Sequence, residues 1–301
     1  MRRGDGNQVH DAADSDGGPY MRARGWEDKK GDVGTTAREN FHMRTTEAKE
    51  EKKCRFCLTV AEKAKEYIED EDAKTLIEKA LGKCREWLDG GRDAAEELYA
   101  CLDDEENGLT VLQERETDKA VSEAWNAVID AVAFICRNAY EESGAEFFPE
   151  PIESVDDGAI DHMVESFSAC LGGDEEATRR LKTEEMKAKS PIRLPDEFFR
   201  LIPKKDDEEI SVCGEKILRL WTAAGCVEMN DAYGVQKRLP RAWAIGDDEG
   251  GYAVVYAEGK KGVGLYAAPF GDLDDSNKTY LADSLSDFLL RGVGVRTFMS
   301  L

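Results

Sequence analysis

The 301-residue chain lacks long apolar runs and has few histidines. No stretch approaches the ~20 apolar residues that a transmembrane helix needs, so the sequence predicts no membrane span. Arg2 and Arg3 are not followed by an apolar segment, so we expect no secretory signal peptide. The three histidines are isolated: His10, His42 and His162. Because none accompanies a Gly-x-Ser-x-Gly nucleophile motif, the sequence argues against a serine hydrolase and predicts a protein that is not an enzyme.

The chain also has fewer basic than acidic residues. Lys and Arg number 41 against 64 Asp and Glu, which gives a net charge of −23. Such a balance disfavours binding to nucleic acid phosphates and to anionic membranes, which both need clustered Lys and Arg. It favours a partner protein with a basic surface, because complementary charges speed association. Solubility alone is the alternative explanation.

The eight cysteines follow no disulfide or metal-binding pattern. Cys54-x-x-Cys57 is a candidate metal or redox pair, but a zinc site needs four ligands and no second such pair occurs. On a helix the same spacing places both side chains on one buried face. Most cysteines lie in apolar helical patterns, where free cysteine behaves as a small core residue. We therefore predict no metal, no cofactor, no disulfide framework and a reducing, cytoplasmic location.

Composition divides the chain into three segments. Residues 1–42 are rich in Gly, Asp, Arg and Asn, and are expected to form a disordered leader. Residues 43–185 show apolar positions at helical spacing and predict an all-helical domain, with helices over 46–69, 71–89, 93–102, 114–142 and 157–171. The boundary falls in the Lys-rich segment 178–195, where two Pro residues occur. Residues 43–190 hold 20 Lys and Arg against 38 Asp and Glu, so the acidity belongs to the helical domain.

In residues 186–301 the helical spacing of apolar residues gives way to short β-type runs, which predicts an α+β domain. Residues 243–245, 252–257 and 263–267 are expected as strands, with 259–262 as a hairpin turn and 281–290 as a closing helix. A segment around 213–224 fits either a helix or a strand. Gly259 to Gly264 superficially resembles a phosphate loop, but it joins two strands and does not open a helix. The expected fold is an antiparallel or mixed sheet flanked by helices.

An acidic turn lies between the first two of these strands. Asp247-Asp248-Glu249-Gly250-Gly251 could bind calcium, contact a partner or simply be a solvated hairpin. Calcium loops of the EF-hand type need spaced oxygen ligands and a distant bidentate Glu, which are missing here. The loop with Asp272, Asp274 and Asp275 is similar.

The order of short motifs in residues 190–295 resembles the SUKH superfamily. The motifs are Leu194-Pro195-Asp196, then Trp243 before Ile245-Gly246-Asp247, then Gly250-Gly251, and finally Ala282-Asp283-Ser284-Leu285 before an amphipathic helix. The resemblance implies a SUKH-like α+β domain. It also implies a binding function, because many bacterial members neutralise a protein toxin by binding it.

The helical half resembles the all-helical immunity protein family numbered six over residues 48–172. The similarity rests on a Cys-containing first helix, Trp87 at the end of the second helix, Trp125 in the long helix and a Phe-Pro-Glu-Pro exit at 148–151. Together the two resemblances imply two fused immunity modules in a polymorphic toxin system.

These resemblances predict a bacterial immunity protein that neutralises a cognate toxin, a nuclease or deaminase with a basic surface, by stoichiometric occlusion. The alternative is a cytoplasmic regulatory scaffold of the SUKH superfamily, also without enzymatic activity. Binding residues commonly lie in loops on a rigid scaffold. We therefore expect the partner-binding residues to be the loop acids Asp247, Asp248, Glu249, Asp272, Asp274, Asp275, Asp103, Asp104, Glu105 and Glu106.

Overall fold

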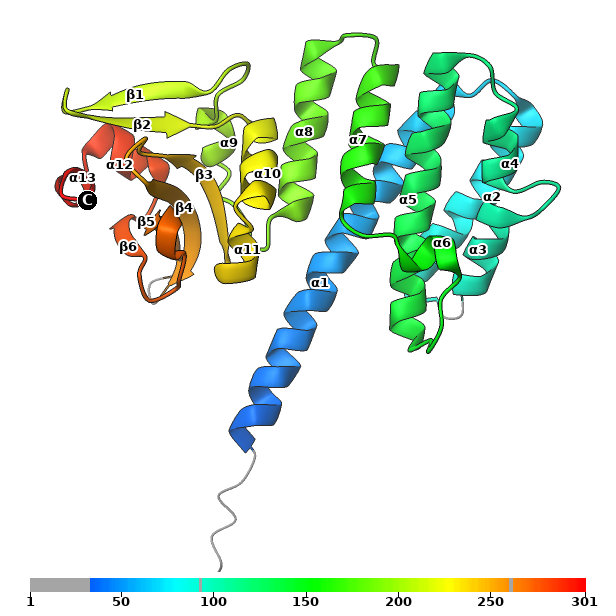
Figure 1. Cartoon of the computed structure of the whole chain (residues 1–301), viewed down its shortest axis with the longest axis horizontal. Helices are drawn as coiled ribbons and strands as arrows, with labels where there is room; N and C mark the ends of the chain where they lie inside the picture. The colour runs from blue at the N-terminus through cyan, green and yellow to red at the C-terminus, as the bar shows by residue number, and fades with distance from the viewer. Residues whose placement is uncertain (1–32, 92–93, 260–261) are drawn as a thin grey trace, which may run out of the picture. The chain divides into compact units, whose positions relative to one another are not determined.

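Helices occupy the first part of the chain (Figure 1). The computed structural model describes residues 33–91, 94–259 and 262–301, with side chains from Ala48 onward. Residues 1–32, most of the expected leader, lie outside the described residues, and the backbone of 33–42 is part of α1. The elements are α1 (Val33–Ala64), η1 (Lys65–Tyr67), α2 (Glu71–Leu88), α3 (Ala95–Asp103), α4 (Leu109–Glu114), α5 (Lys119–Ser143), α6 (Glu150–Glu153), α7 (Gly158–Cys170) and α8 (Glu175–Lys189).

Aspartates fix where three of these helices begin. Asp70 accepts a hydrogen bond from the Ala73 amide at 2.7 Å at the start of α2. Asp118 and Asp174 cap α5 and α8 in the same manner. Such a cap stabilises a helix by roughly 1 kcal/mol, because it pairs a backbone N–H that has no partner within the helix. The five predicted helices are confirmed, whereas α4, α6 and α8 were not predicted, and α8 occupies most of the segment that was expected to be the boundary.

The core of this helical region surrounds α5. Trp125, Phe134 and Ile135 are buried on α5, which packs against α7, α3 and α2. Cys54 and Cys57 point into the same core, and all eight cysteines of the chain are free. Burial raises the pKa of the Cys136 thiol to about 12, so that thiol stays protonated and unreactive at neutral pH. In the described part of the chain, no cluster of three or more His, Cys, Asp and Glu could hold a metal.

A single antiparallel sheet follows. Its strands are β1 (Glu208–Val212), β2 (Lys216–Leu220), β3 (Ala242–Asp247), β4 (Tyr252–Gly259), β5 (Gly262–Pro269) and β6 (Thr279–Ala282), and they pair in sequence order. The longest pairing joins β4 to β5, with Gly259 opposite Gly262. The helices of this region are α9 (Phe198–Leu201), α10 (Ala223–Ala232), α11 (Val235–Arg238), η2 (Phe270–Asp272), α12 (Leu285–Arg291) and α13 (Val295–Met299). The three predicted strands and the closing helix are confirmed, while β1, β6, α10, α11 and α13 were not predicted.

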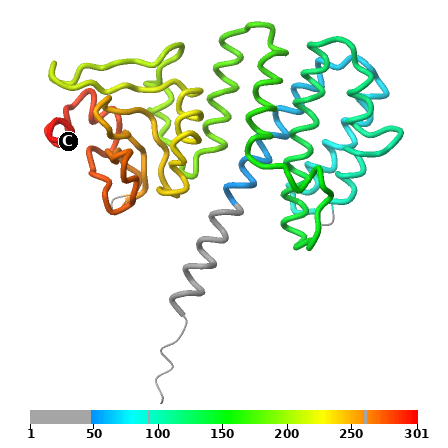
Figure 2. The backbone as a smooth tube through the Cα atoms, in the orientation of Figure 1, coloured from blue at the N-terminus to red at the C-terminus, as the bar shows by residue number. Residues whose placement is uncertain are grey.

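Helix α8 contributes to two hydrophobic cores. Leu181 and Ala188 belong to the core of the helical region, and Met186 belongs to the core around the sheet. The backbone trace shows α8 antiparallel to α7, and α8 also contacts α10 (Figure 2). Residues 43–301 accordingly form one compact unit. The expected domain boundary at residue 185 lies inside α8, and the division into two domains stays a prediction.

Lys189 at the end of α8 connects the two regions by ion pairs. Its Nζ lies 2.5 Å from Asp161 Oδ1 on α7 and 3.0 Å from Asp231 Oδ2 on α10. Only 5% of the residue is exposed. Burial opposes the charge, but the two carboxylates raise the pKa of Lys189 above its ordinary value. Because a buried cation without partners is costly, these carboxylates stabilise the buried end of α8.

One turn earlier on α8, the side chain of Glu185 is fully buried. Its nearest counter-ion is Lys182, whose Nζ lies 3.1 Å from Oε2. Burial is the main reason that the pKa of Glu185 rises to about 7, while Lys182 and Lys189 lower it. Since this folded-state pKa exceeds the unfolded value, the folded protein loses stability as pH rises through about 7.

We predict that Glu185→Gln stabilises the protein at pH 8 and has little effect at pH 5. The neutral amide removes the cost of a buried carboxylate, which is on the order of 1–3 kcal/mol. Urea unfolding of both proteins at the two pH values measures the difference. Glu184→Gln is the matched control, because Glu184 is exposed and paired with Lys187 at 2.7 Å. A stability difference for Glu185→Gln that does not change with pH would contradict the prediction.

Candidate functional site

Exposed acids gather in the loop between α3 and α4. Asp103, Asp104, Glu105 and Glu106 are all exposed, as expected of partner-binding residues. The Asp104 carboxylate accepts hydrogen bonds from the backbone N–H of Glu106 at 3.1 Å and of Asn107 at 2.8 Å. These contacts fix the loop conformation. Glu105 and Glu106 form no ion pair within 4 Å with any described side chain, so their charges are open to a partner.

A second acidic loop lies beside the first and was missed by the sequence analysis. Arg115, between α4 and α5, donates a hydrogen bond to the Glu106 carbonyl at 3.2 Å. This contact places Glu114 and Glu116 at the same end of the helical region as Glu105 and Glu106. The signal was present in the sequence as a short acidic stretch, but only the fold brings the two loops together. We call residues 103–106 and 114–118 together the acidic end.

The acidic turn between β3 and β4 is built differently, because its first two carboxylates are buried. Asp247 and Asp248 are 5% and 4% exposed. Asp247 accepts hydrogen bonds from the Arg219 guanidinium at 3.0–3.1 Å and from Trp221 Nε1 at 3.0 Å. The sequence predicts that these acids face a partner. The structure instead turns them toward the sheet, and their role in partner binding stays a prediction.

Asp248 holds the turn itself. Its Oδ1 accepts hydrogen bonds from the backbone N–H of Gly250 and Tyr252, each at 2.8 Å, and Lys216 Nζ lies 2.8 Å from Oδ2. Burial opposes ionisation, but Lys216 and these N–H groups outweigh it and lower the pKa of Asp248. The carboxylate is therefore charged and committed to internal contacts at neutral pH.

Glu249 is the exposed acid of this turn. It adopts a positive φ of 51° and pairs with Arg219 at 3.2 Å. Gly246 is required nearby, because a Cβ at that position would lie 2.2 Å from the Arg219 carbonyl oxygen. Gly251 has a φ of 111°, which a side chain would strain, while Gly250 is exposed.

The remaining SUKH-like motif residues have structural roles. Trp243, Ile245 and Ala282 are buried in the core around the sheet. Ser284 caps α12 by accepting a hydrogen bond from the Asp287 amide at 3.0 Å, and Asp283 accepts one from the Tyr280 hydroxyl. These residues shape the fold rather than a binding surface.

The loop between η2 and β6 keeps its acids in solvent. Asp272, Asp274 and Asp275 are exposed. Hydrogen bonds from the Ser276 hydroxyl and amide lower the pKa of Asp274, and Asp275 pairs with Lys278. Asp272 accepts a hydrogen bond from Asn277 at 2.7 Å. The loop is thus an acidic surface held by internal hydrogen bonds, and its role in partner binding stays a prediction.

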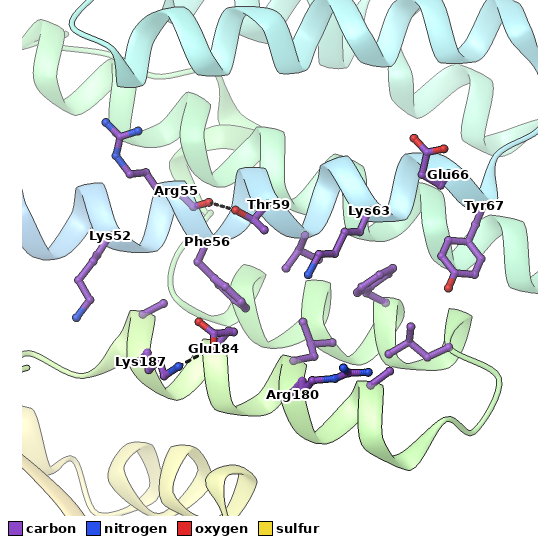
Figure 3. Close-up of a pocket in the computed structure, with 16 residues that line it drawn as sticks. Lys52, Arg55, Phe56, Thr59, Lys63, Glu66, Tyr67, Arg180, Glu184 and Lys187 are labelled. Carbon is purple, nitrogen blue, oxygen red and sulfur yellow. Dashed lines mark hydrogen bonds and ion pairs between the residues drawn. The ribbon is translucent and has the colours of Figure 1, made fainter. Parts of the chain in front are cut away.

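A groove between α1 and α8 was not anticipated. It has a volume of about 720 Å³ and is lined by Phe56, Val60, Phe167 and Leu181, with Lys and Arg side chains along its edges (Figure 3). The sequence does not predict that α1 and α8 lie side by side, because their facing residues are more than a hundred positions apart.

Residues 52–170 match the family Immunity protein Imm6. The matched segment runs from the middle of α1 to the end of α7, and it includes the acidic end. The match confirms the resemblance expected over residues 48–172. The SUKH resemblance of residues 190–295 stays a prediction. No curated protein matches the chain. None of the described helices has the length and apolarity to cross a membrane.

We predict that Asp247→Ala destabilises the protein by about 1–3 kcal/mol, because Trp221 Nε1 and the Arg219 guanidinium lose their shared acceptor. Asp275→Ala, in the exposed loop, is expected to change stability by less than about 0.5 kcal/mol. Chemical denaturation of the two variants alongside the wild type measures both effects. Equal stability of all three proteins would show that Asp247 does not support the turn.

Proposed function

We propose that this protein is a bacterial immunity protein that binds a cognate polymorphic toxin and neutralises it in the cytoplasm without catalysis. The observation that carries the proposal is the match of residues 52–170 to Immunity protein Imm6. The family name implies a protein toxin as partner. The region that matches folds as a set of helices with one core, as a binding module needs.

The charge of the matched segment supports a partner with a basic surface. Residues 52–170 contain 13 Lys and Arg against 30 Asp and Glu. Nucleases and deaminases that act on nucleic acids carry basic clefts for the phosphate backbone, and an acidic protein competes for such a cleft. We propose that the acidic end contacts the toxin and that stoichiometric occlusion of its active site is the mechanism.

The sheet region supports a second, SUKH-like module. Its six antiparallel strands with flanking helices agree with an α+β domain, and the buried Trp243 and Ala282 give a structural reason for the motif. We propose that its exposed acids Glu249, Asp272, Asp274 and Asp275 form a further contact surface. Asp247 and Asp248 would then act indirectly, because they hold the turn that presents Glu249.

The exposure of His162, the one histidine whose side chain is described, is consistent with a non-enzymatic role. His162 Nδ1 lies 2.6 Å from Asp130 Oδ2, a distance typical of an oriented general base. However, 58% of the His162 side chain is exposed, so the imidazole faces water and does not lie in an enclosed pocket. We therefore assign this pair no catalytic role.

The test is co-expression with a toxin encoded by a gene that neighbours the gene of this protein. Relief of killing together with a stable complex on gel filtration is the expected result. Unrelieved killing and no complex would overturn the proposal. In that case the regulatory scaffold becomes the better explanation, and a partner captured under the same conditions that is not a toxin would support it.

We predict that Glu105→Lys with Glu106→Lys slows association with the toxin by about tenfold at low salt and reduces the dependence of the rate on salt. Both residues are exposed and unpaired in the described structure, so stability should change by less than about 0.5 kcal/mol. Stopped-flow or surface plasmon resonance measures the rates. Glu208→Lys with Glu209→Lys is the matched control, because these exposed acids change the charge equally but lie on β1, outside the matched segment. Equal slowing by both pairs would exclude a specific contact at the acidic end.

A further inference from the structure

The groove between α1 and α8 has an apolar floor. Its apolar lining consists of Phe56 and Val60 on α1, Phe167 on α7, and Leu181 and Ala188 on α8. Tyr67 stands at one end with 40% of its surface exposed, and its ring packs edge-on against Phe167 at 5.9 Å. The five floor side chains are each 9% exposed or less, so the floor is apolar but shallow, and Tyr67 supplies most of its exposed apolar surface.

The edges of the groove carry charge of the opposite sign to the rest of the protein. Five of its lining residues are cationic and two are anionic: Lys52, Arg55, Lys63, Arg180 and Lys187, against Glu66 and Glu184. The whole chain has a net charge of −23. A local excess of positive charge around an apolar floor is thus a distinct feature of this surface.

Two of the cations are available for a ligand. Lys63 on α1 and Arg180 on α8 are exposed, and neither forms an ion pair within 4 Å among the described side chains. They extend from opposite helices at the groove (Figure 3). The other three are already engaged: Lys187 pairs with Glu184 at 2.7 Å, Arg55 pairs with Glu51 at 2.9 Å, and Lys52 donates to the Ser190 carbonyl at 3.1 Å.

We propose that this groove binds an acidic amphipathic helix of a partner protein. The sixteen residues from Lys52 to Tyr67, at the end of α1 and in η1, run along the groove, which corresponds to ~24 Å or about four helical turns. A helix of that length would place apolar side chains at positions i, i+3 or i+4, and i+7 on the floor. Acidic side chains on its flanks would meet Lys63 and Arg180.

Charge and shape favour this occupant over two others. A second copy that joined groove to groove would bring the cationic edges together, which is unfavourable. A nucleic acid strand would neutralise the edges but leave the apolar floor without a matching surface. The inference does not rest on the proposed toxin binding, because the acidic end needs a basic partner and the groove needs an acidic one.

The experiment uses the full chain and a fluorescein-labelled peptide of about 18 residues, with Leu at helical spacing on one face and Glu on the flanks. Fluorescence anisotropy is expected to show saturable binding. A peptide with Lys in place of Glu, and a scrambled peptide of the same composition, should bind at least tenfold more weakly. An unlabelled oligothymidylate of similar charge should not displace the acidic peptide.

Variants locate the site. Lys63→Glu with Arg180→Glu should weaken binding by at least tenfold, and Tyr67→Ala by a few fold, with thermal unfolding as the check on folding. Lys79→Glu with Arg193→Glu is the matched control at exposed positions outside the groove and should change affinity less than twofold. No saturable binding, equal loss in the control pair, or displacement by the oligonucleotide would each overturn the proposal. Lys63→Ala with Arg180→Ala gives the same test should the charge reversal unfold the protein.

Discussion

The buried cation Lys189 connects the helical region to the sheet region. It lies at the end of α8, and it pairs at once with Asp161 on α7 and Asp231 on α10. The same helix inserts Leu181 and Ala188 into one core and Met186 into the other. Because both cores and the ion pairs share this single helix, a displacement of α8 would disturb packing on both sides. The groove beside α1 depends on the same helix, so its shape is tied to this connection.

Carboxylates serve two separate purposes in this protein. Asp247 and Asp248 are buried and hydrogen-bonded, and Asp161 and Asp231 bind Lys189. Other acids, including Glu105 and Glu106, remain exposed without an ion pair among the described residues. The first group stabilises the fold, since removing one partner of a buried pair leaves the other uncompensated. The second group contributes little to folding and shapes the field that a partner meets.

The sequence predicted the helices and strands whose formation depends on residues close to one another along the chain. Helices α1, α2, α3, α5 and α7 follow from apolar positions at helical spacing, and β3 to β5 follow from short β-type runs around glycines. Helix α8 was missed because its sequence is rich in Lys and Glu. The short β6 and α10 were missed because each is defined by what it packs against: β6 by its register with β5, and α10 by contacts with α8. The burial of Asp247 was missed for the same reason. Its sequence context is that of an open turn, whereas its partners Trp221 and Arg219 lie 26 and 28 residues away.

Acidic and cationic side chains gather on different surfaces of the helical region. In the helical region the acids outnumber the bases and are spread over loops at the acidic end, whereas the groove collects cations around an apolar floor. Electrostatic attraction acts over about a Debye length of 8–10 Å, so each surface selects the sign of charge that approaches it. Dispersed acids on loops favour fast, salt-sensitive association with a broad basic surface. An apolar groove favours a defined segment, because burial of apolar side chains requires a matching shape. The two surfaces therefore differ both in the sign of the partner they attract and in the kind of contact they stabilise.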